Sequence, residues 1–263
     1  MISLKLRLIR EHNRVYRYLL KWLWRVQGKD SPRVYMFHSV VDSPEHVYSQ
    51  FAITKDSFER FIEHELRRGQ IPMDAETLKK AVDNPSAYNN HFIVTFDDIY
   101  DSVYTNAYPI LKAHKVPFII FVTPSLIDTI DANPKSNNPM ITSEHLREIA
   151  SDPLCIIGAH ATHHVAFRTL NGAQACSSMM KSKQWLENTF GKKVDFFAFP
   201  FGRRVEVSNA NIGTLSQCDF CCGFSALDGS LKQKWMSGRW FLPRILVDDE
   251  YVAKAWTNKG NRA

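Results

Sequence analysis

The sequence contains few cysteines, no long apolar run and no internal repeat. Five cysteines in 263 residues form an odd and sparse set, which indicates a reducing compartment rather than a disulfide framework. No 18 consecutive residues are apolar, and the charges of Arg7, Arg10, Arg14 and Arg17 interrupt any signal-peptide core. We therefore expect an intracellular protein.

The composition lacks the bias of disordered, collagen-like or coiled-coil chains, because 44% of the residues are hydrophobic and 23% are charged. A chain of this length buries roughly 70 to 75% of its unfolded surface, so it needs neither a metal nor disulfides merely to fold. Any metal site would therefore be functional. We expect one folded domain over residues 31–263, preceded by a separate segment at residues 1–30.

The net charge of +6 is confined to residues 1–30, and the rest of the chain is neutral. This argues against a nucleic-acid protein with a basic face. At about 100° per residue, the basic residues of the segment fall on one stripe and its apolar residues on another side, which predicts a basic amphipathic helix. Two interpretations stay open: a helix docked on the domain, or one that lies on an anionic membrane surface. The stripe comprises Arg7, Arg10, Arg14, Arg17, Lys21 and Arg25.

Short β-like runs alternate with longer helical patterns after residue 32. The predicted strands are 34–37, 92–96, 117–122, 155–157, 194–199, 220–224 and 242–247. The predicted helices are 54–68, 102–114, 142–150, 173–190 and 205–216. Such alternation is typical of an α/β fold with a parallel sheet, and about seven strands in one domain favour a (β/α) barrel over an open sheet. Residues 124–139 are expected to form a long loop.

Two adjacent carboxylates, Asp97 and Asp98, directly follow the second predicted strand. Neighbouring side chains on a strand point in different directions, so one Asp could bind a cation while the other takes up a proton. The competing interpretation is a helix N-cap before residues 102–114, a position that Asp serves well. Taken alone, the Asp pair is explained slightly better by a helix N-cap than by a functional pair of carboxylates.

Three histidines follow the predicted strand 155–157, in the sequence GAHATHH. His160 and His164 are four residues apart, and on a helical turn that spacing places two imidazoles on one face, where they can meet one ion. A single histidine at a strand end is more often a satisfied polar residue, but three within five positions favour a metal site. His163 is expected to be a bystander.

Two further motifs are weaker. The aromatic strand FFAFPFG ends in a Pro-X-Gly turn that could expose the Phe201 amide to an oxyanion. Without the other two motifs, a hydrophobic strand with a structural turn would be the clearly preferred interpretation. Cys218, Cys221 and Cys222 could form half of a metal site, but no second cysteine or histidine pair follows them, so buried strand cysteines are the preferred interpretation.

Several segments together resemble the polysaccharide deacetylase domain (NodB-like, carbohydrate esterase family 4) over roughly residues 33–250. They are TFDDIYDSVYTNAYPILKAHKVPFIIFVTPSLID, MITSEHLREI, IIGAHATHHVAF, SKQWLENTFGKKVDFFAFPFG and FLPRI. The resemblance implies a distorted (β/α) barrel, and a hydrolase that removes acetyl groups from N-acetylated sugars with a divalent metal.

The resemblance also implies residue roles. It assigns Asp97 as the catalytic base and the Phe201 amide as oxyanion donor, with Pro200 and Phe201 lining the substrate groove. The implied metal ligands are Asp98, His160 and His164. Two imidazoles and one carboxylate suit zinc best, and Fe, Co or Ni would also fit.

Three features depart from the family pattern. Ile99 stands where the family has Gly, which removes easy access to positive φ. Ala198 replaces the usual Arg, so another residue must orient the base, and Arg244 in LPRI is the candidate. The family often uses a late histidine as the general acid, but no histidine follows His164. His38 resembles the YH motif of a permuted subgroup with a FAYPYG-like third motif. We therefore expect His38 to act as the general acid rather than in a structural role.

The leading hypothesis is a metal-dependent deacetylase of hexosamine units in a glycan or lipid-linked glycan precursor, serving surface polysaccharide biosynthesis. We expect it in the cytoplasm, at the inner membrane face through residues 1–30, without a nucleic-acid partner. The alternative is an inactive metal-binding barrel that acts as a glycan-binding or scaffolding protein, for which Ile99 and the missing Arg are the best support.

Overall fold

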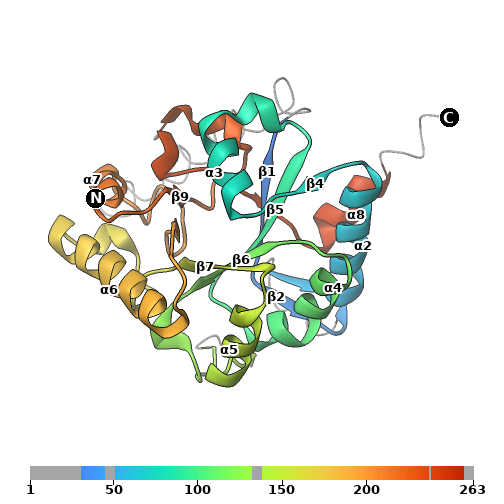
Figure 1. The fold of residues 1–263 in the computed structure, drawn as a ribbon, viewed down its shortest axis with the longest axis horizontal. Coiled ribbons are helices and arrows are strands. Elements are labelled where there is room, and N and C mark those ends of the chain that lie inside the picture. Colours follow the sequence, from blue (N-terminus) through green and yellow to red (C-terminus); the bar gives the residue numbers. More distant parts are fainter. Residues whose placement is uncertain (1–30, 45–50, 132–137, 237, 258–263) are drawn as a thin grey trace, which may run out of the picture.

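A curved parallel sheet forms the centre of the structure, a computed structural model that describes residues 31–44, 51–131, 138–236 and 238–257 (Figure 1). The strands follow the order β10 (Ile245–Leu246), β1 (Arg33–Phe37), β5 (His91–Phe96), β6 (Phe118–Val122), β7 (Cys155–Ala159), β8 (Phe196–Ala198) and β9 (Cys222–Phe224). The short β4 (Ile71–Pro72) pairs with the start of β5. Two strands form a separate parallel sheet, β2 (Ser39–Val41) and β3 (Ala52–Thr54).

Helices surround the sheet in Figure 1. They are α2 (Lys55–Arg67), α3 (Ala75–Asp83), α4 (Tyr108–Ala113), α5 (Ser143–Ser151), α6 (Gly172–Phe190), α7 (Asn209–Thr214) and α8 (Asp249–Thr257). A π-helical turn, Val103–Ala107, leads directly into α4. Short 3₁₀ turns are Pro85–Tyr88, Pro124–Leu126, Phe167–Thr169, Leu215–Gln217, Leu231–Met236 and Gly238–Trp240.

Helix starts follow local capping chemistry. The side chains of Thr54, Asp74, Thr142 and Ser208 each accept a hydrogen bond from a backbone N–H in the first turn of the helix that follows. Asn171 does so as part of a capping box with Gln174. Such caps satisfy backbone donors that have no partner within the helix. They fix where each helix leaves the loop at the end of its strand.

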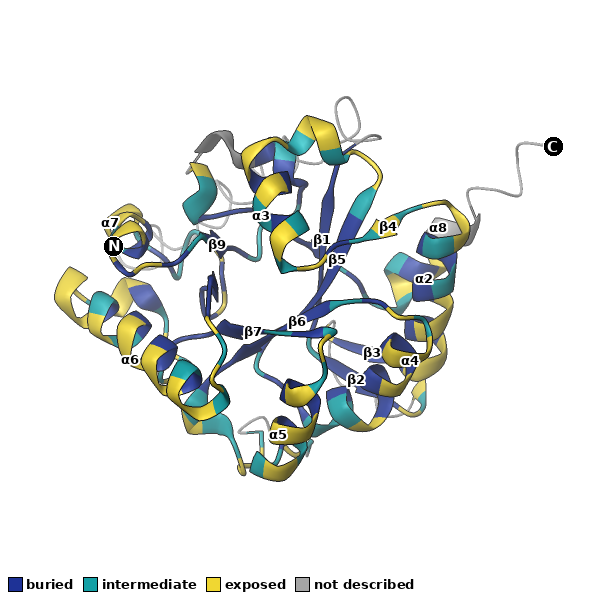
Figure 2. Cartoon of the chain, viewed as in Figure 1, coloured by how far each residue is buried: buried dark blue, intermediate teal, exposed yellow. Residues whose placement is uncertain are grey.

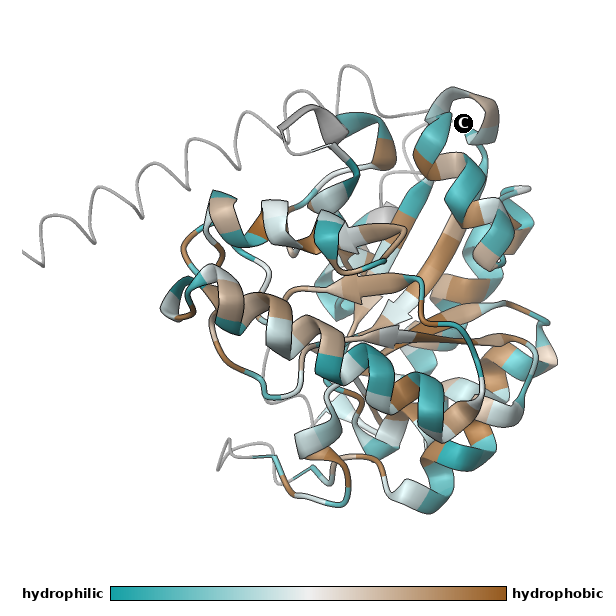
Figure 3. Cartoon of the chain, turned by 60° about the vertical axis from the view of Figure 1, so that its left-hand side comes forward, coloured by the Kyte–Doolittle hydropathy of each residue, from teal (hydrophilic) through white to brown (hydrophobic). Residues whose placement is uncertain are grey.

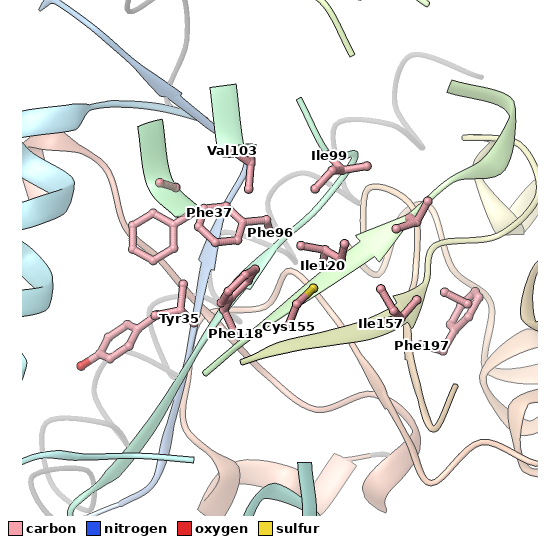
Figure 4. Packing of buried hydrophobic residues seen from close by; sticks show 14 of the residues in the cluster. Tyr35, Phe37, Phe96, Ile99, Val103, Phe118, Ile120, Cys155, Ile157 and Phe197 are labelled. Atoms are coloured by element: carbon pink, nitrogen blue, oxygen red, sulfur yellow. The ribbon is translucent and has the colours of Figure 1, made fainter. Parts of the chain in front are cut away.

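The sheet is buried on both faces, as expected for parallel strands covered by helices. In β6, Phe118 and Ile120 belong to one apolar cluster, and Ile119 and Phe121 belong to the other. Figure 4 shows the first cluster, with aromatic side chains from β1, β5 and β6 packed together. In Figures 2 and 3 the strands are mostly buried and hydrophobic, whereas the helices are polar on the side that faces solvent.

The sheet forms an incomplete barrel. A parallel bridge between Phe224 and Leu242 brings the end of β9 next to the segment that precedes β10. The predicted distorted barrel of about seven parallel strands is therefore confirmed. Because all strands run parallel, their carboxyl ends share one edge, and the residues that follow β1, β5, β7 and β8 lie along that edge.

Some element predictions were wrong or incomplete. The predicted helix 205–216 is shorter, comprising α7 and one 3₁₀ turn, and the predicted strand 194–199 contracts to β8. The sequence analysis missed α3, α8 and the two- or three-residue strands β2, β3 and β4, which are too short for a periodic pattern. The predicted helix at residues 1–30 lies outside the described residues. Within the described part of the chain, no helix has the length and apolar character to span a bilayer.

Candidate active site

Three side chains from the ends of β5 and β7 converge on one point. Oδ1 of Asp98 lies 3.3 Å from Nε2 of His160 and 3.1 Å from Nε2 of His164. The three potential ligand atoms all lie within 4.8 Å of one another. The predicted pair of histidines does meet, but residues 160–164 form an irregular segment with a bend at 162–163, not the helical turn that we used to justify the spacing. Ala161 adopts a φ of 65°, in the left-handed region, which does not occur within a regular right-handed helix.

The donor set fits a divalent cation. Nδ1 of His160 lies 2.7 Å from the Ala198 carbonyl oxygen, so this nitrogen must carry the proton. In neutral His160 the bare Nε2 then faces the Asp98 carboxylate, an arrangement in which two acceptors oppose each other unless a cation lies between them. Both Nε2 of His160 and Oδ1 of Asp98 are buried without a hydrogen bond from any described residue. Two imidazoles and one carboxylate are typical ligands of zinc.

Other candidate ligands are less suitable. His163 is exposed, and its Nδ1 contacts only the neighbouring Thr162 hydroxyl, at 3.2 Å. A second cluster comprises Glu59, Glu63 and His114. Glu59 in that cluster is exposed, and the carboxylate of Glu63 is already paired with Arg67 at 3.1 Å. The site of Asp98 differs from this second cluster because its ligand atoms, Oδ1 of Asp98 and Nε2 of His160, are buried without a hydrogen-bond partner among the described residues.

Asp97 lies beside this cluster and is held by Arg244. Arg244 donates to Oδ1 of Asp97 at 2.7 Å and to Oδ2 at 2.6 Å, and both side chains are buried. The guanidinium also donates to the Thr95 hydroxyl at 3.2 Å and to the Ser225 carbonyl at 2.8 Å. Burial alone would raise the pKa of Asp97, but the positive charge of the Arg244 guanidinium outweighs it and lowers that pKa. Asp97 is therefore ionised at neutral pH.

The backbone after Asp97 is strained. Asp98 has a φ of 64° and Ile99 a φ of 57°, both in the left-handed region. This region disfavours a β-branched residue, yet Ile99 occupies it with a side chain that is only 1% exposed. Ile99 thus adopts a positive φ despite its β-branched side chain, and burial of that side chain in the core compensates for the strain.

His38 follows β1 and lies at the same edge of the sheet. Its Nδ1 is buried and has no hydrogen-bond partner among the described residues. The imidazole packs against the Phe51 ring, with 4.6 Å between the ring centroids. Burial lowers the pKa of His38, although the carboxylates of Asp97 and Asp98 act in the opposite direction. An imidazole that is affected by the charge of both carboxylates and whose Nδ1 has no partner among the described residues can exchange a proton with a substrate.

The loop after β8 supplies the remaining predicted residues. Pro200 is buried, whereas Phe201 is 46% exposed and its ring centroid lies 4.4 Å from that of His164. Phe201 has a φ of 58°, and its N–H has no acceptor among the described residues. Gly202 is required at the next position, since its φ is 57° and a Cβ there would lie 2.4 Å from the Ala226 nitrogen.

The cysteines lie away from this site. Cys222 is buried in β9, Cys218 is buried just before it, and Cys221 is half-buried. Cys218 also lies 3.4 Å, sulfur to sulfur, from Cys176 on α6. No cysteine belongs to a group of candidate metal ligands among the described residues.

Two residues of the site were missed from the sequence. Thr95 joins Arg244 to the Tyr35 carbonyl, to which its hydroxyl donates at 3.0 Å. Alternation along β5 places Thr95 and Asp97 on one face, and this could have identified it. Phe51 gave no local signal, because its contact with His38 depends on the pairing of β2 with β3.

Comparison with known proteins identifies the family of the chain. Residues 85–217 match the family model described as polysaccharide deacetylase. The chain is 26% identical over 175 residues to a poly-beta-1,6-N-acetyl-D-glucosamine N-deacetylase of Staphylococcus aureus, a match that covers 62% of the chain. The chain spans only 57% of the length of that relative.

Two solved structures share the fold. IcaB from Ammonifex degensii aligns with a TM-score of 0.70 and 22% identity, over 86% of the chain and 95% of IcaB. The Streptococcus pyogenes deacetylase PplD aligns with a TM-score of 0.69 and 20% identity, over 85% of the chain and 97% of PplD. The family match spans half of the chain, including the Asp pair and the histidine motif, and so this chain belongs to the polysaccharide deacetylase family.

Proposed function

We propose that the protein is a metal-dependent N-deacetylase that hydrolyses the N-acetyl groups of hexosamine units in a glycan. One observation carries this proposal: a buried carboxylate fixed by an arginine, Asp97, lies next to a three-residue cation site, Asp98, His160 and His164. A base and an electrophile at one point are what hydrolysis of an amide requires, because an amide is a poor electrophile and water a poor nucleophile.

The cation would be held by Asp98, His160 and His164, with zinc preferred and Fe, Co or Ni as alternatives. When bound, such a cation polarises the amide carbonyl and makes water more acidic. The Ala198 carbonyl keeps the proton of His160 on Nδ1, which leaves Nε2 free as a ligand atom.

The protein's own groups would then move the protons. Asp97 accepts a proton from the attacking water as the new bond to the carbonyl carbon forms, and Arg244 keeps both carboxylate oxygens in place. His38 donates a proton to the nitrogen as the carbon–nitrogen bond breaks, so that an amine and acetate are released. The Phe201 N–H donates to the oxygen that carries the developing negative charge.

Pro200 and Phe201 would line the substrate site. The Phe201 ring is exposed beside His164, where it offers an apolar face to a sugar ring. The name of the Staphylococcus aureus relative makes β-1,6-linked N-acetylglucosamine the first substrate to test. A lipid-linked glycan precursor is the substrate that we infer for the cell, because residues 1–30 carry the whole net charge of +6.

That basic segment would hold the protein at the cytoplasmic face of a membrane. Each basic residue near an anionic surface contributes about 1 kcal/mol, so six on one stripe are sufficient for peripheral binding. Co-sedimentation of the full chain with phosphatidylserine vesicles tests this. Binding at low salt that disappears at high salt, or when the six stripe residues are replaced by Gln, is expected; binding that survives the replacement would reject the proposal.

Acetate release from β-1,6-linked N-acetylglucosamine oligomers tests the activity. We expect release by the full chain that stops after chelation and returns with added Zn²⁺. Asp97→Asn serves as the inactive control. Oligomer binding without acetate release under any metal would instead support a glycan-binding barrel. The positive φ of Ile99 and the hydrogen bonds from Arg244 to Asp97 support the active enzyme over that alternative.

A further inference from the structure

We propose that Ser102 and Asn106 are positioning residues that hold the general acid, His38, in place. They lie on the helix that follows the Asp pair, at and within the π-helical turn Val103–Ala107. Neither residue contacts the reacting groups. The inference rests on the proposed function, and it assigns this turn a role in the reaction rather than in folding alone.

Both backbone groups of Val40 are held by the two side chains. The Val40 N–H donates to the Ser102 hydroxyl at 3.2 Å, and the Asn106 side-chain amide donates to the Val40 carbonyl at 2.8 Å. Val40 is fully buried and Asn106 is 8% exposed, so bulk water cannot replace the bond from Asn106, whereas Ser102 is half-buried. We call this arrangement the Val40 clamp.

The Val40 clamp acts on one edge of β2, and β3 occupies the other. The neighbouring Ser39 N–H donates to the Phe51 carbonyl at 3.3 Å, on the β3 side. Successive backbone groups of a strand point to opposite edges, so those of Val40 face the helix. The segment after His38 is therefore fixed from both sides.

Proline explains why the helix is widened at this point. Tyr108 donates its N–H to the Val103 carbonyl, five residues back, just before Pro109. A proline within a helix lacks a donor and clashes with the carbonyl four residues earlier, which here is that of Thr105. A π-helical turn relieves that clash, and such turns occur frequently at functional sites. Ser102 and Asn106, four residues apart, both face Val40.

His38 depends on these backbone anchors. On its N-terminal side, the Phe37 carbonyl accepts a hydrogen bond from the Asp97 N–H at 3.0 Å. On its C-terminal side, the Val40 clamp is two residues away. The imidazole Nδ1 has no partner among the described residues, so packing against Phe51 and the fixed backbone define where the ring lies. Figure 4 shows Phe37 and Val103 together, at the junction of strand and helix.

Two acetylated substrates separate positioning from general stability. Hydrolysis of an N-acetylhexosamine expels a basic amine and needs the proton from His38. Hydrolysis of 4-nitrophenyl acetate expels a weakly basic phenolate and does not. Loss of a positioned acid therefore lowers kcat for the amide selectively, whereas partial unfolding lowers both activities equally.

The variants are Ser102→Ala, Asn106→Ala and His38→Ala, with Ser102→Thr as the conservative variant that keeps the hydroxyl. Tyr108→Phe is the matched control, since it removes a hydrogen bond of the same helix, to Asp152 at 2.7 Å, far along the chain from His38. We expect Ser102→Ala and Asn106→Ala to lower kcat for the amide about ten-fold, with KM and ester hydrolysis changed by less than about two-fold. Ser102→Thr and Tyr108→Phe should retain the amide activity.

An NMR measurement, which requires no catalytic turnover, tests this proposal independently of the proposed function. The His38 ring signals in ¹H–¹³C NMR spectra should shift or broaden in Ser102→Ala and Asn106→Ala, but not in Ser102→Thr or Tyr108→Phe. Unchanged His38 signals in both alanine variants would overturn the proposal, and so would equal losses of amide and ester activity. Absence of amide hydrolysis by the unmodified chain would reject the proposed function, while the NMR result would still decide on the Val40 clamp.

Discussion

Both carboxylate oxygens of Asp97 accept hydrogen bonds from Arg244, at 2.7 and 2.6 Å, although the two residues are far apart in the sequence. The pair is buried, and Arg244 comes from the segment just before β10 rather than from the β8 loop. The orientation of Asp97, the proposed base, is thus fixed by a residue from the other end of the sheet. Replacement of Arg244 should therefore affect Asp97 directly.

Replacement of Arg244 should cost both stability and turnover. Arg244→Ala leaves a buried carboxylate without its partner, so we expect the free energy of unfolding to fall by about 3–5 kcal/mol. Arg244→Lys keeps the charge but not the two parallel hydrogen bonds, and should fold while kcat falls about ten-fold. Urea unfolding and steady-state kinetics measure both effects. Arg239→Ala, which breaks the surface pair with Asp83, should change stability by less than about 1 kcal/mol.

Metal content should depend on His160 and not on His163. His160→Ala removes one of three ligands, so we expect purified protein to lose most of its bound divalent ion. His163→Ala is the control, because His163 is exposed and lies outside the ligand cluster. Elemental analysis by mass spectrometry measures the ion per chain. Equal metal content in the two variants would mean that the ion binds elsewhere.

Asp97→Asn should abolish turnover while the metal stays bound. The substitution preserves the shape of the side chain but removes the group that accepts the proton. Acetate release and metal content are measured on the same preparation. Loss of the ion together with activity would show that Asp97 is a ligand, and retained activity would show that another base operates.

Ile99→Gly should destabilise the protein even though it removes backbone strain. Relief of the positive φ is worth about 1–2 kcal/mol, but loss of a fully buried isoleucine costs about 2–5 kcal/mol. We expect a net loss of about 1–3 kcal/mol in unfolding free energy, with metal binding retained. Ile99→Val, which keeps the strain, should lose about 0.5–1.5 kcal/mol. A stabilised Ile99→Gly would contradict this balance.

Alkylation of Cys221 should titrate near neutral pH. A hydrogen bond from Cys222 lowers the pKa of the half-buried Cys221 thiol to about 7. The thiolate is the reactive form, so the rate of reaction with iodoacetamide should rise between pH 6 and pH 8, with a midpoint at about 7. Peptide mass spectrometry follows the modification.

Cys222→Ala and Cys155 provide the controls for this titration. Cys222→Ala removes the hydrogen bond, so the midpoint for Cys221 should move toward the ordinary thiol value of about 8.5. Burial raises the pKa of Cys155, which should stay unmodified in the folded protein. A midpoint that does not move in Cys222→Ala would show that another group lowers the pKa.

The sequence predicted those site residues that directly follow apolar runs. Asp97 and Asp98 after β5, and His160 and His164 after β7, meet because parallel strands end at one edge. Arg244 was predicted only because Ala198 left a role unfilled. The geometry between the histidines differed from our expectation, since Ala161 has a positive φ in an irregular segment where we predicted a helical turn.

The contacts around His38 could not be predicted in the same way. Ser102 and Asn106 act on Val40, more than 60 residues earlier in the chain. Phe51 reaches His38 only through the pairing of two three-residue strands. Such contacts depend on tertiary packing and leave no periodic pattern. Only Pro109, within a segment that otherwise has a helical pattern, could have indicated that the helix is irregular, and the sequence analysis did not use it.

The hydrogen bond from His160 to the Ala198 carbonyl links the candidate cation site to the end of β8. Ala198 ends β8, and the chain then turns through Pro200 to Phe201. In the proposed enzyme, a cation of different radius that shifts the His160 ring would therefore also displace the end of β8, from which the chain leads to Phe201. We expect that exchange of such a cation and a change of the proposed substrate site could not be engineered separately. Variants selected for a new metal should show altered substrate preference as well.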